Sequence, residues 1–257
     1  MSLKPRRVGD VYVCSRCDQI LGSVTLVRRV TTTRAGGVSA PPFDTFNLGD
    51  HVGDDPAAVA ANRARLARAI GLTADHLVWM NQVHGDHVEV VTGPRTDPVE
   101  DTDALVTTTP RLALAVVTAD CVPVLLADAR AGVVAGVHAG RVGAANGVVL
   151  RTVEAMLAQG AHIADISVLL GPAVSGANYE VPAKMAADVE ARLPGSRTRT
   201  ARGTPGLDLR AGIARQLIGA GIKSIDADPR CTVADPNLFS HRRGAPTGRL
   251  ASVVWME

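Results

Sequence analysis

Three short apolar runs that follow one another closely decide the fold: LALAVV at residues 112–117, VPVLLA at 122–127 and GVVAGV at 132–137. Runs of this length suit strands better than helices. Because nearly every position is apolar, rather than every second one, other parts of the chain must cover both faces of these strands. We therefore expect an α/β (α+β) fold in which the three runs are buried strands.

Outside these strands, the clearest helix begins at Asp55-Pro56, because Asp55 can cap it and Pro56 suits its first turn. An apolar stripe follows, and Gly71 ends the helix. Similar patterns predict helices over residues 144–157, 182–193 and 208–220, and strands over residues 24–30, 77–80, 87–91, 163–170, 231–233 and 253–255. We assign residues 23–257 to a single catalytic domain and residues 1–22 to a mobile N-terminal extension.

The composition excludes several classes of protein. Among 257 residues, 27 Lys and Arg nearly balance 25 Asp and Glu, so the net charge of +2 gives no electrostatic reason to expect a nucleic-acid partner. No apolar run is long enough to span a bilayer, and no signal-type stretch follows the basic start, so we expect a cytoplasmic protein without a membrane partner. Four cysteines are too few for a disulfide framework at this length. Two of them, Cys14 and Cys17, fall in the N-terminal extension and receive no role.

Three side chains that can bind a metal stand in separate apolar frames: His84 in NQVHG, Cys121 in TADCVP and His138 in GVHAG. Two imidazoles and one thiolate suit Zn²⁺, and three protein ligands leave a fourth position open for water or substrate. The set predicts a catalytic zinc site, with copper as an alternative ion because copper outcompetes zinc in most sites. The simpler alternative is that each residue is packed separately in the core.

Asp120 interrupts the buried strands, so its charge needs a partner or a task. Neighbours on a strand point to opposite faces, and we therefore do not expect Asp120 and Cys121 to serve the same atom. Asp120 is a candidate to orient a ligand histidine or to act in acid–base chemistry.

Two arginine-bearing stretches are candidates for binding an anion. The loop over residues 31–42 contains glycines, Ser39 and Arg34 but lacks the Lys-Ser/Thr of a phosphate P-loop. It either presents backbone N–H groups and Arg34 to an anion or is an ordinary surface turn. The cluster from Arg242 to Arg249 is open to the same two interpretations, an anion site or a solvated surface.

Further motifs follow one order along residues 32–255. They are TTRAGGVS at 32–39, FNLG at 46–49, HVGDD at 51–55, QVHG at 82–85, DALVT at 103–107, TADCVP at 118–123, VHAG at 137–140, GPA at 171–173, YEV at 179–181, LDL at 207–209, CT at 231–232, FSHRR at 239–243 and TGR at 247–249. This ordered set resembles the laccase-domain family, once described as polyphenol oxidases and now as zinc-dependent purine nucleoside phosphorylases.

The resemblance implies two packed mixed β-sheets flanked by helices, similar to the catalytic domains of cytotoxic necrotizing factors. It implies zinc on His84, Cys121 and His138. It also implies phosphorolysis of adenosine, inosine, guanosine and methylthioadenosine, with adenosine deamination as a second activity. Purine nucleosides and inorganic phosphate are then the expected partners of a monomer or homodimer.

On this basis we assign catalysis to the three ligands and Asp120. The residues assigned to substrate or phosphate binding are Arg34, Ser39, Asn47, Gln82, Arg141, Arg242, Arg243 and Arg249. Arg34 ranks first for phosphate, since the Gly-rich loop beside it can add backbone donors to the same anion.

The chain departs from the family pattern at two places near these residues. Arg141-Val142-Gly143 stands where the family usually has Trp-Arg-Gly, and His241 stands where Tyr usually precedes the double arginine. The metal ligands are unaffected, whereas the preferred substrate is left open.

Other functions follow from different uses of the same residues. A copper-dependent polyphenol oxidase (laccase) is one, although seven histidines without paired spacing are few for a multicopper enzyme. A metal-free Cys–His amidohydrolase that edits cell-wall precursors is another, with Cys121 as nucleophile and His84 or His138 as base. A binding protein without catalysis is a third, and the polar residues in the apolar frames argue against it.

Overall fold

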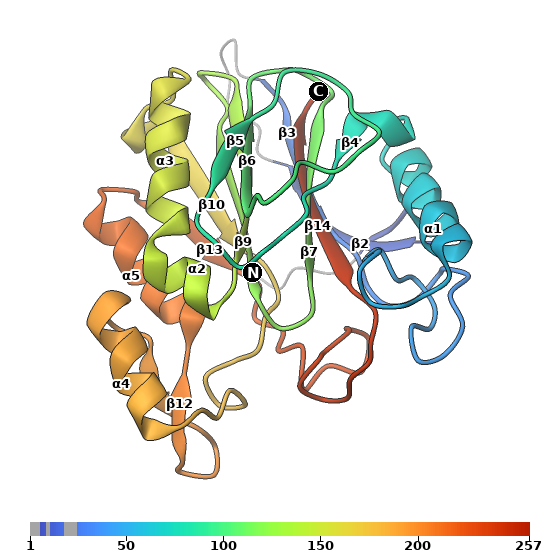
Figure 1. The fold of residues 1–257 in the computed structure, drawn as a ribbon. Helices are drawn as coiled ribbons and strands as arrows, with labels where there is room; N and C mark the ends of the chain where they lie inside the picture. Colours follow the sequence, from blue (N-terminus) through green and yellow to red (C-terminus); the bar gives the residue numbers. More distant parts are fainter. Residues whose placement is uncertain (1–5, 9–10, 18–24) are drawn as a thin grey trace.

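The computed structural model describes residues 6–8, 11–17 and 25–257, and two six-stranded β-sheets form its centre (Figure 1). The first sheet has the strand order β1 (Arg6–Val8), β2 (Val11–Cys17), β3 (Val27–Thr31), β14 (Leu250–Met256), β7 (Ala113–Thr118), β4 (Leu77–Val78). The second has the order β13 (Ser224–Ala227), β10 (Ile166–Leu170), β8 (Val122–Asp128), β9 (Val133–Ala139), β6 (Ala104–Thr107), β5 (Val88–Val90). Both sheets are mixed, because β4–β7, β5–β6 and β10–β13 pair in parallel whereas the other pairs are antiparallel. A separate antiparallel ribbon joins β11 (Arg197–Arg199) to β12 (Pro205–Leu207).

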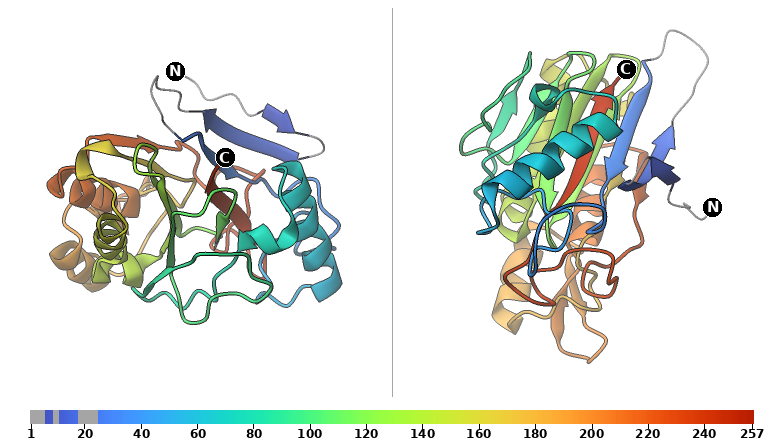
Figure 2. Two further views of the ribbon diagram at one scale, coloured as in Figure 1. Left: turned by 90° about the horizontal axis from the view of Figure 1, so that it is seen from above. Right: turned by 90° about the vertical axis from the view of Figure 1, so that its right-hand side faces the viewer.

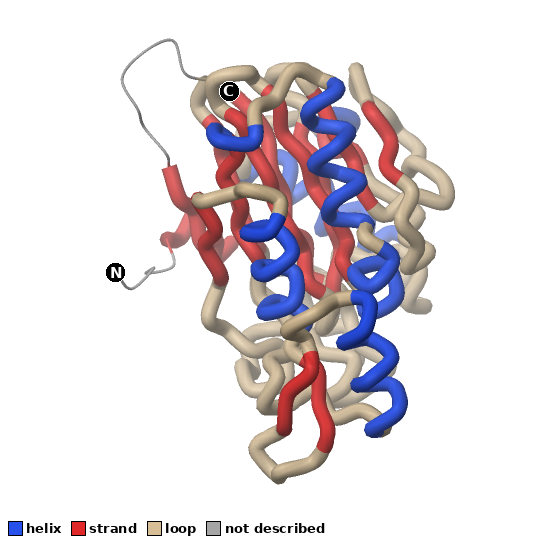
Figure 3. The backbone as a smooth tube through the Cα atoms, turned by 90° about the vertical axis from the view of Figure 1, so that its left-hand side faces the viewer, coloured by secondary structure: helices blue, strands red, loops and turns tan. Residues whose placement is uncertain are grey.

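Helices cover the outer side of each sheet, so the molecule has four layers. Helix α1 (Pro56–Ala69) lies across the first sheet (Figure 2). Figure 3 shows the helices on the outer side of the second sheet. These are α2 (Arg141–Asn146), α3 (Val148–Ala158), α4 (Ala183–Arg192) and α5 (Leu209–Gly219), and two short 3₁₀ helices, η1 (Ala74–His76) and η2 (Ile163–Asp165), precede β4 and β10.

The three apolar runs form β7, β8 and β9, as predicted, and alternate side chains explain why the runs are continuous. In β7, Ala113 and Ala115 pack toward α1, whereas Leu114 and Val116 pack between the two sheets. Leu125 of β8 belongs to the same layer between the sheets. Each face of these strands is therefore buried, and the polar residues Thr118, Asp128 and His138 stand at or near the strand ends. The prediction of two packed mixed sheets flanked by helices is confirmed, whereas the likeness to cytotoxic necrotizing factors stays a prediction.

Helix α1 begins where the sequence predicts. The Asp55 side chain accepts a hydrogen bond from the backbone N–H of Ala57, and Gly71 follows the helix with a positive φ of 75°. The predicted helix over residues 144–157 is instead two helices, because Gly147 adopts a left-handed conformation between them. The predicted strand over residues 231–233 is wrong, since only an isolated bridge between Cys231 and Ala173 is present.

The N-terminal extension lies only partly within the described residues. Backbone pairing joins β1 to β2 and β2 to β3, so residues 6–8 and 11–17 extend the first sheet. Residues 1–5, 9–10 and 18–24 lie outside the description, and the mobility expected for residues 1–22 stays a prediction. Among the described residues, no helix is both long and apolar enough to cross a membrane.

One end of the sandwich collects the chemically interesting connections. Residues 119–121 carry the chain from β7 in the first sheet to β8 in the second, and β9 ends beside them with His138 and Ala139 paired to β8. Chain crossings of this kind bring loops from both sheets to one place.

Candidate metal centre and its pocket

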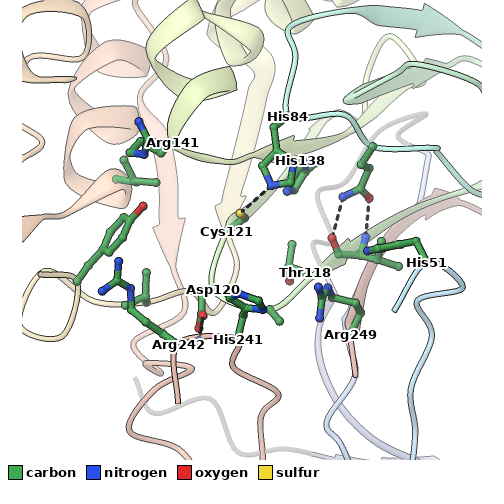
Figure 4. Close-up of a pocket in the computed structure, with 16 residues that line it drawn as sticks. His51, His84, Thr118, Asp120, Cys121, His138, Arg141, His241, Arg242 and Arg249 are labelled. Atoms are coloured by element: carbon green, nitrogen blue, oxygen red, sulfur yellow. Dashed lines mark hydrogen bonds between the residues drawn. The ribbon is translucent and has the colours of Figure 1, made fainter. Parts of the chain in front are cut away.

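The three predicted ligands meet at this end of the sandwich (Figure 4). His84 lies in the loop between β4 and β5, Cys121 between β7 and β8, and His138 in β9. Their ligand atoms all lie within 4.8 Å of one another, and Cys121 Sγ is 3.9 Å from His84 Nε2. Around a tetrahedral zinc ion, such atoms stand roughly 3.5 Å apart. Small side-chain movements would therefore complete the site, and the donor set fits a metal ion.

Uncommon backbone conformations and a closely packed glycine bring these side chains together. His84 and Asp120 have positive φ angles of 60° and 95°, a conformation that residues other than glycine seldom adopt. Gly140 lies directly against the cluster: a Cβ atom there would be 2.8 Å from His84 Cδ2 and 3.3 Å from Cys121 Sγ. Only glycine at this position leaves room for the ligands.

A buried carboxylate, Asp103, holds two of the ligands at once. Its Oδ1 accepts a hydrogen bond from His138 Nδ1 at 2.7 Å and from the backbone N–H of His84 at 3.1 Å. Its Oδ2 accepts from the backbone N–H groups of Val83 and Gly85. The task of orienting a ligand histidine, which we considered for Asp120, thus belongs to Asp103. The sequence analysis missed this role, although an aspartate directly before the buried strand β6 is a sign of a special function.

The charges of the cluster favour a thiolate. Burial on its own would raise the pKa of the Cys121 thiol, but His138 and His84 outweigh this effect and lower the pKa to about 6. For His138 the directions are opposite: burial on its own would lower the pKa of the imidazole, but Cys121 and Asp103 raise it. Metal ions bind thiolates rather than thiols, so Cys121 is prepared to act as a ligand near neutral pH.

Asp120 has a different set of partners. Its Oδ1 accepts a hydrogen bond from the Thr232 hydroxyl at 2.6 Å, and its Oδ2 accepts from the backbone N–H of Arg242 at 2.8 Å. Asp120 therefore fixes the segment that carries His241 and Arg242 beside the three candidate metal ligands. As expected, Asp120 and Cys121 serve different atoms.

A pocket of about 340 Å³ opens over the cluster. Of the residues predicted to bind substrate or phosphate, Gln82, Arg141, Arg242 and Arg249 line it together with Asp120. Both ends of the Gln82 amide are already used, because Nε2 donates to the Val117 carbonyl and Oε1 accepts from the Val117 N–H. Gln82 thus attaches the His84 loop to the end of β7, and Arg141, Arg242 and Arg249 remain as the predicted anion-binding residues that line the pocket.

The other four predicted residues do not line this pocket. The Arg34 guanidinium donates to the carbonyl and the carboxylate of Asp44 and stacks on the Phe239 ring. Because these contacts already occupy the guanidinium, Arg34 is no longer the first candidate among the arginines for binding phosphate. Arg243 donates to four backbone carbonyls of residues 232–238. Two buried residues serve the loops around α1: Ser39 accepts from Asn62, and Asn47 contacts Gly49, Asp54 and Arg249.

Several pocket residues carried no role in the sequence analysis. They include His51, Thr118, Tyr179 and His241. Their positions within the quoted motifs offered a sign, but nothing in their spacing shows that the end of β7 and three separate loops converge. The stacking of Arg242 on the Tyr179 ring, at 4.6 Å from its centre, likewise depends on that convergence.

A second group of metal-binding type, Asp128, His162 and Asp165, lies at the opposite end of β8. Both Asp128 oxygens accept hydrogen bonds from backbone N–H groups, namely those of Arg130, Ala131 and His162. This carboxylate therefore closes the turns at the strand end.

Comparison with known proteins shows the family of this chain. A family model described as multi-copper polyphenol oxidoreductase laccase matches residues 28–257. The chain belongs to this laccase-domain family. The resemblance expected from the motifs is thus confirmed over nearly the whole chain.

Close relatives within the laccase-domain family carry an enzyme name. A purine nucleoside phosphorylase of Mycobacterium tuberculosis (strain ATCC 25618 / H37Rv) is 76% identical over 237 residues, which cover 92% of this chain and 95% of that protein. A purine nucleoside phosphorylase of Corynebacterium glutamicum is 60% identical over 232 residues, covering 90% of this chain and 94% of that protein. Among solved structures, YlmD from Geobacillus stearothermophilus superposes with a TM-score of 0.88 at 30% identity, covering 99% of each chain.

Proposed function

We propose that this chain is a zinc-dependent purine nucleoside phosphorylase that acts on adenosine, inosine, guanosine and methylthioadenosine. The observation that carries the proposal is the meeting of His84, Cys121 and His138 at one pocket with Arg141, Arg242 and Arg249. A metal-binding set supplies an electrophile, and guanidinium groups bind phosphate. The names of the close relatives support the same reaction.

In the proposed reaction, a phosphate oxygen forms a bond to the anomeric carbon of the ribose. The bond from this carbon to the purine nitrogen breaks, and its electron pair leaves with the base. Dihydrogen phosphate brings the proton that the departing purine takes up, so the products are the free base and ribose 1-phosphate. Such a reaction needs a cationic anion site and stabilisation of the negative charge that develops on the base.

The residues of the pocket can divide these tasks among them. The guanidinium groups of the pocket stabilise a phosphate anion that binds beside the nucleoside. Asp103 holds His138 with Nε2 toward the cluster, and Asp120 keeps the segment of Arg242 in place. When bound, zinc would supply a Lewis acid at the open fourth position of the site.

We propose adenosine deamination as a second activity of the same pocket, on the strength of the family resemblance. In it, water attacks the purine carbon that bears the amino group, the bond from this carbon to the amino nitrogen breaks, and ammonia leaves with a proton from the water, which gives inosine. Whether the chain works as a monomer or a homodimer stays a prediction, as does its cytoplasmic location.

The proposal is tested by base release from a panel of nucleosides, with and without phosphate and with and without a chelator. We expect release to require both phosphate and metal. Cys121→Ala should abolish activity and metal binding yet unfold cooperatively, because the large core does not depend on the ligand thiolate. Loss of cooperative unfolding in this variant would instead indicate a structural metal.

One geometric observation favours a second candidate, a Cys–His amidohydrolase that edits cell-wall precursors. The Cys121 thiol is 3.9 Å from His84 Nε2, and its pKa is lowered to about 6, as in nucleophilic cysteines. A cysteine alkylator would stop such an enzyme, whereas a chelator would not. Copper-dependent phenol oxidation needs a different test, namely metal analysis together with turnover of a laccase substrate after loading with copper.

A further inference from the structure

Thr118 lines the pocket, and its hydroxyl has no hydrogen-bond partner among the residues that the structure describes. Thr118 ends β7 and is only 2% exposed. Buried hydroxyls nearly always have a partner, since leaving one unpaired is costly. An unpaired hydroxyl that faces a pocket therefore indicates a ligand that completes it.

Arg249 stands beside Thr118 with donors to spare. Its neighbour Leu250 pairs with Thr118 across the sheet, and Figure 4 shows the Arg249 guanidinium next to Thr118. Nη1 donates to the carbonyls of Thr247 and Gly248, and within the described part of the chain no partner is found for Nε or Nη2. Two donors on one edge of a guanidinium match two oxygens of a phosphate.

The position of Arg249 is fixed by the structure around it. Its backbone N–H donates to Asn47 Oδ1 at 2.8 Å, and Gly49 lies so close that a Cβ there would be 2.6 Å from Arg249 Cγ. This packing holds the arginine stem, so less conformational entropy is lost when the guanidinium binds a ligand. The buried residue Asn47, which we expected to contact substrate, thus acts by supporting Arg249.

The opposite end of the pocket has a different character. Figure 4 shows Arg141 and Arg242 on one side of Cys121, and Arg249 and His51 on the other. Among the described residues that line the pocket, Tyr179 is the only Phe, Tyr or Trp, and the Arg242 guanidinium stacks on its ring at 4.6 Å. A flat ring with a stacked guanidinium suits a planar base better than a tetrahedral anion.

We propose that Thr118 and Arg249 form the oxyanion subsite that takes inorganic phosphate, and that the end with Tyr179 and Arg242 takes the purine. The three candidate metal ligands lie between these two ends. The anomeric carbon of the ribose has to lie there too, because it is bonded to the purine and is attacked by the phosphate. This division rests on the proposed function and adds to it the orientation of the two substrates.

The test measures phosphate binding without turnover, by equilibrium dialysis of labelled phosphate against zinc-loaded protein without nucleoside. Thr118→Val removes only the hydroxyl, and we expect the phosphate Kd to rise about tenfold, the usual effect of losing one hydrogen bond to a charged group. Thr118→Ser keeps a hydroxyl and should restore most of the binding. Arg249→Gln should raise the Kd further, with zinc content unchanged.

Arg242→Gln is the matched control, because it removes a guanidinium from the other end of the pocket. In steady-state assays it should raise the nucleoside KM, whereas Thr118→Val and Arg249→Gln should raise the phosphate KM. The inference is overturned if phosphate does not bind the zinc-loaded protein, or if Thr118→Val and Arg249→Gln leave its Kd unchanged. If both variants lose phosphate binding but the wild-type protein releases no base, the subsite stands and the proposed function fails. If phosphorolysis occurs while both variants keep the wild-type phosphate KM, the proposed function stands and the subsite assignment fails.

Discussion

His138 Nδ1 donates to Asp103 Oδ1 over 2.7 Å, with both side chains buried, so only Nε2 of His138 is free to bind a metal. The same carboxylate accepts from the backbone of residues 83–85 and thereby fixes the loop of His84. One buried aspartate thus sets the geometry of two candidate ligands, one on β9 and one on the loop between β4 and β5. This arrangement leads to the first prediction.

Asp103→Asn should weaken zinc binding by about 10- to 100-fold, the usual effect of removing the partner of a ligand histidine. The amide also loses the charge that stabilises the hydrogen bonds from the His84 loop. Competition with a chromophoric chelator measures the affinity. Asp97→Asn is the control, because Asp97 is exposed and does not line the pocket of the three candidate ligands. Equal zinc affinity in both variants would mean that Asp103 has only a structural role.

Gly140→Ala should displace the ligands without unfolding the protein. The added Cβ would lie 2.8 Å from His84 Cδ2, so the His84 ring must move away from Cys121. We expect zinc content to fall while the thermal unfolding of the metal-free protein changes little. Gly219→Ala, where a Cβ meets no atom within 4 Å, is the matched control and should keep its zinc. Full zinc occupancy in Gly140→Ala would show that the cluster is less closely packed than described.

In metal-free protein, alkylation of Cys121 should become fast as the pH rises through about 6. The neighbouring imidazoles lower the thiol pKa, so the reactive thiolate is present above that pH and is lost below it. Mass spectrometry of the alkylated peptide gives the rate at each pH. A half-maximal rate near pH 8 to 9, the range of an unperturbed thiol, would contradict the electrostatic account.

Arg34→Met should affect stability more than phosphate binding. Arg34 donates to Asp44 at two atoms and stacks on Phe239, and loss of these contacts should lower the free energy of unfolding by about 1–3 kcal/mol. The phosphate KM should change far less than in Arg249→Gln. A larger rise of the phosphate KM in Arg34→Met would return this arginine to the binding site.

The sequence predicts the centre of this fold well because strands that are buried on both faces have a distinctive composition. The runs at 112–117, 122–127 and 132–137 became β7, β8 and β9 with shifts of only one or two residues at their ends. The group of candidate metal ligands could also be predicted from the sequence. His84, Cys121 and His138 are residue types that bind metals, and each stands in an apolar stretch where a polar residue is unusual.

The remaining features depend on contacts between distant residues. Nothing near Asp103 indicates that it reaches a histidine 35 residues later. The Gly-rich loop beside Arg34 has the composition of an anion site, but the chain turns back and places Asp44 against the guanidinium. The predicted helix over residues 144–157 contains Gly147, whose left-handed conformation becomes evident only when α2 and α3 are packed on β9.

The most direct test of the central claim is ³¹P NMR of the zinc-loaded protein with adenosine or inosine and inorganic phosphate. The account predicts that ribose 1-phosphate appears in an amount equal to the free base, that both stop when a chelator is added, and that zinc restores them. Base release at the same rate without phosphate, or without any ribose 1-phosphate, would mean hydrolysis and would contradict the account.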